Sequence, residues 1–204
     1  MKRKISIALL TLGIALLWGC YPGGPDYAEE MDIVLTKHEA DYDFAAKTTY
    51  AMPDRIVKIT GDVTEGDDPE FIPDVTAKKI LDQIKLNMDE LGWVKVDVSA
   101  DPDLLLTPAA WETTTIYYYY DYWYWWYGGY YPYWGYYPPM YVTSYTTGTL
   151  LMTLIDPAIE GSNGIPVRQW SGALNGILTG SYNATRVNGL IDKAFDVSPY
   201  LKTN

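Results

Sequence analysis

The chain has 204 residues, with 26 Asp and Glu against 15 Lys and Arg. The formal net charge of -11 argues against a role in nucleic-acid binding, because such a surface repels the phosphate backbone. A single cysteine excludes an intrachain disulfide, and a single histidine, His38, excludes a three-histidine zinc site.

The first 20 residues have the order of a bacterial lipoprotein signal. Residues 2–4 are basic, residues 5–18 are apolar, and Gly19 precedes Cys20. This apolar run of 14 residues is shorter than the roughly 20 that span a membrane. The order resembles a lipobox, in which a signal peptidase cleaves before the cysteine and the cysteine is acylated. Trp18 departs from it, since a small residue is usual there. An uncleaved signal anchor and a plain secreted protein are the alternatives.

Cleavage after residue 19 would remove three basic residues and no acidic one, so the side-chain charge would change from -11 to -14. Two or three acyl chains on Cys20 give durable membrane attachment. Residues 20–30, which contain prolines and glycines, predict a flexible tether, and residues 31–204 are long enough for a single domain. Because Tyr21 follows the cysteine, we expect the outer membrane, with the domain on its periplasmic side.

The N-terminal part of the domain predicts short strands. Residues 32–36, 48–52 and 55–60 are rich in Val, Ile, Thr and Tyr, which favour strands. Residues 41–44 predict a turn, and residues 61–74 form an acidic loop with six Asp or Glu and no basic residue.

A helix follows, predicted by apolar residues at helical spacing, with Asp74 as N-cap and Gly92 as its end. The apolar residues are Ala77, Ile80, Leu81, Ile84, Met88 and Leu91. Residues 93–98 alternate as in a half-buried strand, and residues 104–106 and 111–120 predict further extended segments.

The C-terminal part predicts a hairpin and a second helix. Residues 150–155 and 167–173 flank the turn signal at 161–164, and Asn183 is a candidate helix cap. The apolar residues of this helix are Val187, Leu190, Ile191, Ala194 and Phe195. The whole pattern predicts an α+β fold, with an antiparallel sheet, two amphipathic helices packed on one face, and an aromatic-rich insertion.

The insertion at residues 117–141 contains 13 Tyr and 4 Trp, with glycines and prolines between them. So many polar ring ends cannot all find partners inside a small domain, so we expect much of the segment to be exposed, with a tip near residues 128–129. The candidate partner-binding residues are Tyr122, Trp123, Tyr124, Trp125, Trp126, Tyr127, Tyr130, Tyr131, Tyr133, Trp134, Tyr136 and Tyr137.

Three interpretations of this segment stay open. Its rings could bind a glycan or another protein, they could lie at the bilayer interface, or the segment could be a low-complexity loop that binds nothing. The absence of Lys and Arg within it argues against nucleic-acid stacking.

Signals for catalysis and metal binding are weak. His38 fits a surface histidine, and the acidic loop does not have the spacing of an EF-hand calcium site. Asp101 and Asp103 flank a proline and are most simply turn residues. Asn183 also begins a glycosylation sequon, without expected consequence in a bacterial lipoprotein. We therefore expect no catalytic residues, no metal and no cofactor.

Several segments together resemble one bacterial lipoprotein family, catalogued as domain of unknown function 4136. They are residues 41–44 with 48–51, residues 88–93, residues 101–106, residues 148–157, residues 167–172 with Trp170, and residues 191–195. The resemblance covers nearly the whole mature chain. It implies a cell-envelope lipoprotein of α+β fold with no assigned activity.

The sequence thus predicts a non-enzymatic, membrane-anchored envelope lipoprotein that binds a protein or glycan partner through the aromatic segment. The alternative is a structural or assembly component that uses its sheet edge or helices, with the aromatic segment incidental. The oligomeric state does not follow from the sequence.

Overall fold

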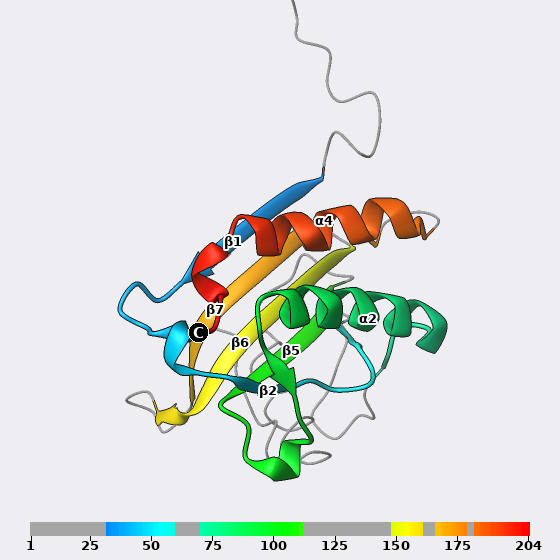
Figure 1. Cartoon of the computed structure of the whole chain (residues 1–204). Helices are drawn as coiled ribbons and strands as arrows, with labels where there is room; N and C mark the ends of the chain where they lie inside the picture. Colours follow the sequence, from blue (N-terminus) through cyan, green and yellow to red (C-terminus); the bar gives the residue numbers. More distant parts are fainter. Residues whose placement is uncertain (1–31, 60–69, 112–147, 161–165, 179–181) are drawn as a thin grey trace, which may run out of the picture. The chain divides into compact units, whose positions relative to one another are not determined.

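The computed structural model describes residues 32–59, 70–111, 148–160, 166–178 and 182–204 (Figure 1). The chain divides into Met1–Glu30 and Met31–Asn204, and the described residues all belong to the second unit.

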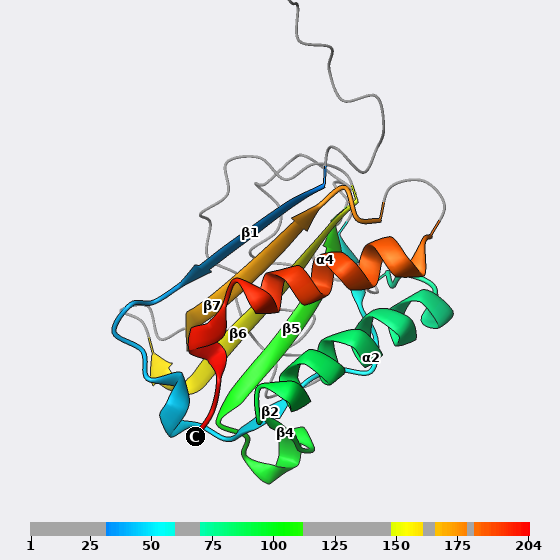
Figure 2. The same ribbon diagram turned by 45° about the horizontal axis from the view of Figure 1, so that its top comes forward.

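Within the described residues, seven strands form one sheet, in the order β1-β7-β6-β5-β2-β4, and β3 also pairs with β5. The strands are β1 (Ile33–His38), β2 (Thr49–Ala51), β3 (Val57–Ile59), β4 (Val94–Lys95), β5 (Leu104–Trp111), β6 (Thr149–Glu160) and β7 (Pro166–Asn175). Figure 2 shows β1, β7, β6 and β5 side by side along the sheet.

The predicted hairpin is confirmed, because β6 and β7 pair antiparallel with Leu154 opposite Trp170. β1 with β7 and β5 with β6 are also antiparallel. The predicted antiparallel sheet is confirmed in part, since the sheet is mostly antiparallel but β2 and β3 run parallel to β5, and β4 runs parallel to β2. Parallel neighbours need a long crossover, and the chain between β3 and β5, which includes a helix, supplies it.

Both predicted helices are present as α2 (Asp74–Glu90) and α4 (Ala184–Asp196), along with the short 3-10 helices η2 (Phe44–Ala46), η3 (Val98–Ala100) and η4 (Pro199–Leu201). Asn183 caps α4 as predicted, since its side-chain oxygen accepts from the Arg186 N–H at 3.1 Å. Asp74 does not cap α2: Pro73 holds the N-cap position, and the Asp74 carboxylate accepts instead from Arg55 Nε at 3.3 Å.

The two helices pack against each other (Figures 1 and 2). A polar contact joins them, because the Asp192 carboxylate accepts from Gln83 at 2.6 Å and from Asn87 at 2.7 Å. Every buried apolar side chain of α2 and α4 belongs to one core cluster.

The same cluster contains alternate residues of the central strands, which we call the helix-facing residues. They are Leu104, Leu106, Ala110, Leu150, Met152, Leu154, Trp170 and Leu174. The indole N–H of Trp170 donates to Ser198 Oγ at 3.0 Å, which satisfies its polar atom inside the core.

The residues between them point to the other side of the sheet and form what we call the opposite face. They are Val57, Ile59, Leu105, Ala109, Trp111, Leu151, Ile155 and Ala173, each at most 4% exposed and none part of the core cluster. On the edge strand β1, Ile33 and Leu35 continue this face, because Leu35 pairs with Ala173 and Ile33 with Asn175. These two side chains are 50% and 47% exposed.

The extended segment predicted at residues 93–98 is shorter than expected. β4 covers Val94–Lys95, and a 3-10 helix follows after Asp97, whose carboxylate accepts from the Ser99 N–H at 2.9 Å. This local contact competes with strand pairing, as it does at many Asp positions. Of the segment predicted at residues 111–120, only Trp111 is described, as the end of β5.

Candidate functional site

The residues predicted to bind lipid or a partner lie outside the described residues. This holds for Cys20 and for all twelve candidate Tyr and Trp residues of the aromatic segment. The structure does describe the two residues that flank positions 112–147. The Gly148 N–H donates to the Trp111 carbonyl at 2.7 Å, and Trp111 pairs with Thr149 across β5 and β6. The described chain therefore stops before residues 112–147, which contain the aromatic segment, and resumes after them at adjoining positions, at the end of β5 and just before β6.

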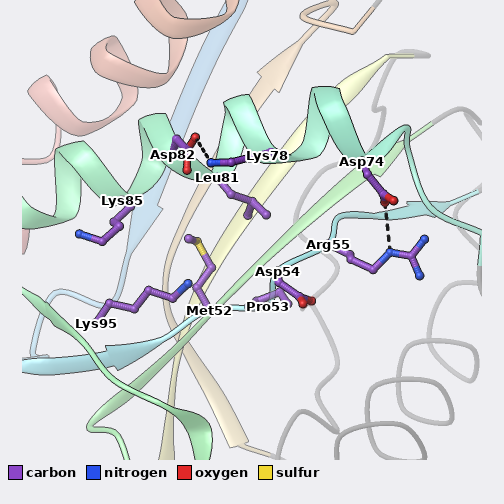
Figure 3. Close-up of a pocket in the computed structure, with 10 residues that line it drawn as sticks. All are labelled: Met52, Pro53, Asp54, Arg55, Asp74, Lys78, Leu81, Asp82, Lys85 and Lys95. Atoms are coloured by element: carbon purple, nitrogen blue, oxygen red, sulfur yellow. Dashed lines mark hydrogen bonds and ion pairs between the residues drawn. The ribbon is translucent and has the colours of Figure 1, made fainter.

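Among the described residues, a groove lies where β2 gives way to β3. Ala51 pairs with Leu105 and Val57 with Ala109, so five residues of the edge face three residues of β5. The extra two residues leave the sheet edge and open a hollow of about 490 Å³ beside α2 (Figure 3). It is lined by Met52, Pro53, Asp54, Arg55, Asp74, Lys78, Leu81, Asp82, Lys85 and Lys95.

Most charges of this groove are paired on its rim. Lys78 pairs with Asp82 at 2.7 Å, and Arg55 pairs with Asp74 at 3.3 Å (Figure 3). Such exposed pairs are screened by water and contribute little. Besides Met52, Pro53 and Leu81, the lining residues are the charged side chains of Lys, Arg and Asp, so the groove offers both polar and apolar contact.

A second polar cluster is built around Asp156, which is 1% exposed. Its carboxylate accepts from the Tyr42 hydroxyl at 2.7 Å and pairs with Lys47 Nζ at 2.8 Å. Burial, and then the bond to Asp156, raises the pKa of Tyr42 well above its ordinary value, so this phenol stays neutral. The cluster ties the loop after β1 to β6, and this contact was missed from the sequence because 114 residues separate the two partners.

Asp103 sits at the start of β5, as the turn interpretation expects. One of its oxygens, Oδ2, accepts from the backbone N–H and the hydroxyl of both Thr48 and Thr49, at 2.8 to 3.4 Å. Asp101, two residues earlier, has a φ of 54°, a left-handed conformation typical of a tight turn.

His38 ends β1 and stacks on Tyr200, with ring centroids 3.7 Å apart. Within the described ranges, no group of three or more His, Cys, Asp or Glu side chains could hold a metal ion. No helix in the same ranges is long and apolar enough to cross a membrane.

The fold defines a class: an α+β domain with a mixed, mostly antiparallel sheet and two long helices. The model of the family described as "Domain of unknown function (DUF4136)" matches residues 34–200, so the chain belongs to this family. The predicted resemblance is thereby confirmed. The family's description assigns no function.

One solved structure of the same family supports the fold, and two others show weaker similarity. A DUF4136 family protein from Bacteroides thetaiotaomicron is 25% identical, with a TM-score of 0.61, over 84% of this chain and 97% of that one. A PelC dodecamer from Paraburkholderia phytofirmans is 16% identical, with a TM-score of 0.42, over 85% of this chain and 99% of that one. A PDZ domain protein from Parabacteroides distasonis is 16% identical, with a TM-score of 0.33, over 83% of this chain and 35% of that one. No curated protein matches the chain.

Proposed function

We propose that the protein is a non-enzymatic lipoprotein of the bacterial cell envelope that binds a protein or glycan partner through its aromatic segment. Cys20 would anchor it to the outer membrane, with the domain in the periplasm. The observation that carries the proposal is the composition of residues 117–141, in which 17 of 25 residues are Tyr or Trp. These side chains offer rigid contact area with a polar end, and they dominate binding interfaces.

The described structure supports this arrangement in two ways. The short bond between Gly148 and Trp111 fits an aromatic insertion that leaves and re-enters the sheet at one place. The shared core cluster fits a layer in which both helices pack on one face of the sheet. Such a body would hold the insertion on two rigid central strands, which favours a defined binding surface.

The test is a pull-down from solubilised envelopes with the chain and with a variant lacking residues 128–138. We expect the deletion to abolish retention of envelope material while the variant still unfolds cooperatively on heating. A variant shortened within the acidic residues 61–68 serves as a control for the loss of a connecting segment, and it should retain the same material as the wild type. Equal retention by all three proteins would contradict the proposal.

The alternative function uses the body of the domain for assembly with other envelope proteins. Exposed apolar side chains on two elements favour it, namely Ile33 and Leu35 on the edge strand β1, and Val75 and Leu86 on α2. A free strand edge can pair with another chain. Under this alternative, crosslinked partners survive the deletion of residues 128–138 but are lost when Leu35 is changed to Lys.

A further inference from the structure

The opposite face of the sheet is buried, yet the helices bury none of their apolar side chains against it. Its eight residues are at most 4% exposed, whereas every buried apolar side chain of α2 and α4 belongs to the helix-facing core cluster. Side chains this well buried must be in contact with other parts of a protein. Some segment of the chain beyond these two helices therefore covers this face.

The surface to be covered is apolar in character. Its polar groups are hydroxyls and amides that find partners within the sheet, and the buried guanidinium of Arg168, which lies opposite Ile155 and contacts Glu39 at 3.3 Å. Thr149 Oγ1 donates to Asn175 Oδ1 at 2.9 Å, and Thr107 Oγ1 donates to the Thr153 carbonyl at 3.4 Å. Apart from Arg168, the side chains that remain to be packed on this face are Val, Ile, Leu, Ala and Trp, so an apolar or aromatic cover fits best.

Length and composition select one segment among those outside the described residues. Residues 60–69 hold four acidic side chains in ten positions, and residues 161–165 and 179–181 are too short to cover several strands. Residues 1–30 belong to the other unit of the chain. The 36 residues from 112 to 147 are long enough and contain the 17 rings of the aromatic segment.

The pattern of exposure points to the same segment. Residues 112–147 leave the sheet at Trp111 and return at Gly148, at the end of β5 and β6. Burial is complete on these strands, with Ala109 and Ile155 at 0%, and is lost at the distant edge, where Leu35 is 47% exposed. A cover that starts from β5 and β6 and stops short of β1 produces this gradient.

We propose that part of the segment 112–147 folds back over the opposite face, with Tyr and Trp rings packed against β5, β6 and β7. The rings that are not part of this layer are free to bind the partner. This statement about partner binding rests on the proposed function. Tyr and Trp suit both roles, because the ring body packs on apolar side chains while the polar end stays in water. The insertion is then a structural layer as well as a binding segment.

The test compares two neighbouring alanines that lie on different sides of the sheet. Ala109→Cys places a thiol on the opposite face and Ala110→Cys places one among the helix-facing residues, in chains with Cys20→Ser. In the full chain both thiols should resist a maleimide reagent. When residues 112–147 are replaced by Asn-Gly, a two-residue hairpin turn, Ala109→Cys should react at least about tenfold faster while Ala110→Cys stays protected. Continued protection of Ala109→Cys would overturn the proposal.

Because the shortened chain could unfold, a second measurement uses the full chain. A photoreactive benzoylphenylalanine replaces Ser171, a half-buried residue of β7 that pairs with Thr153 and so lies on the opposite face. Its crosslinked peptides are identified by mass spectrometry. Crosslinks to peptides from residues 112–147 support the proposal, whereas crosslinks only to other segments or other molecules, or none, overturn it. Neither readout involves an envelope partner, so failure of the pull-down leaves this inference separately testable.

Discussion

At the scale of single residues, Asp103 joins the start of β2 to the start of β5. Its Oδ2 accepts four hydrogen bonds from Thr48 and Thr49. Asp103→Asn keeps the shape but weakens these charge-assisted bonds, so we expect the free energy of unfolding to fall by about 1–2 kcal/mol in urea denaturation. Asp101→Asn is the matched control, because Asn tolerates the left-handed conformation at this turn and should leave stability unchanged. Equal effects of the two changes would contradict the role given to Asp103.

The same carboxylate makes this stability difference depend on pH. Burial raises the pKa of Asp103, but hydrogen bonds from the Thr48 and Thr49 N–H groups outweigh it and leave the pKa below its ordinary value of 3.8. A carboxyl with a lowered pKa in the folded state stabilises the fold above its ordinary pKa, and that stability is lost as the pH falls through the lowered value. The gap between wild type and Asp103→Asn should therefore be constant near neutral pH and shrink as the pH falls below 3.8.

At the scale of elements, two glycines give opposite predictions. In β7, a Cβ added at Gly172 would lie 2.8 Å from the Trp170 ring and 3.2 Å from Met152 Cε. Gly172→Ala should therefore destabilise the fold by about 1–3 kcal/mol, because the buried ring cannot shift freely. In α4, nothing lies within 4 Å of a Cβ at Gly189, so Gly189→Ala should stabilise the fold by about 0.5–1 kcal/mol. Thermal unfolding of both variants checks the pair, and destabilisation by both would refute the packing described for β7.

The sequence predicted the elements whose signal is local. The apolar stripes of α2 and α4 and the hairpin of β6 and β7 were evident from spacing, because one face of each element is buried. The parallel pairing of β2, β3 and β4 could not be predicted, since it depends on where the crossover through α2 returns the chain. The break between β2 and β3, and the groove it opens, depends on the register of both strands against β5, which no local pattern encodes.

The candidate site also has one part that the sequence predicts and another part that it does not. Composition alone identifies the aromatic segment, because its 17 rings stand together in the chain. The burial of the opposite face and the contact of Tyr42 and Lys47 with Asp156 follow only from the three-dimensional arrangement, since they join positions far apart in the sequence. A segment of unusual composition is thus easy to find from the sequence, whereas the buried face that is proposed to contact it is not.

At the scale of the whole molecule, the net negative charge of the domain disfavours its binding to the membrane that is proposed to hold it. Without residues 1–19 the side-chain charge is -14, from 12 basic and 26 acidic residues. Such a domain is repelled by anionic headgroups, so its own surface cannot supply electrostatic attachment. The proposed attachment would then depend on acyl chains at Cys20, which act through the hydrophobic effect and are insensitive to salt.

This reasoning predicts how the protein distributes between membrane and soluble fractions. Wild type should stay with membranes in 1 M NaCl, where the Debye length is about 3 Å, and leave them only in detergent. Cys20→Ser should abolish incorporation of a fatty-acid analogue, because it removes the sulfur that is acylated. A Cys20→Ser chain shortened to begin at residue 20, exported behind an ordinary cleavable signal, should be soluble, which separates the acyl anchor from the apolar residues 5–18. If that chain remains membrane-bound in high salt, the domain itself binds the membrane, and the bilayer-interface interpretation of the aromatic segment gains over partner binding.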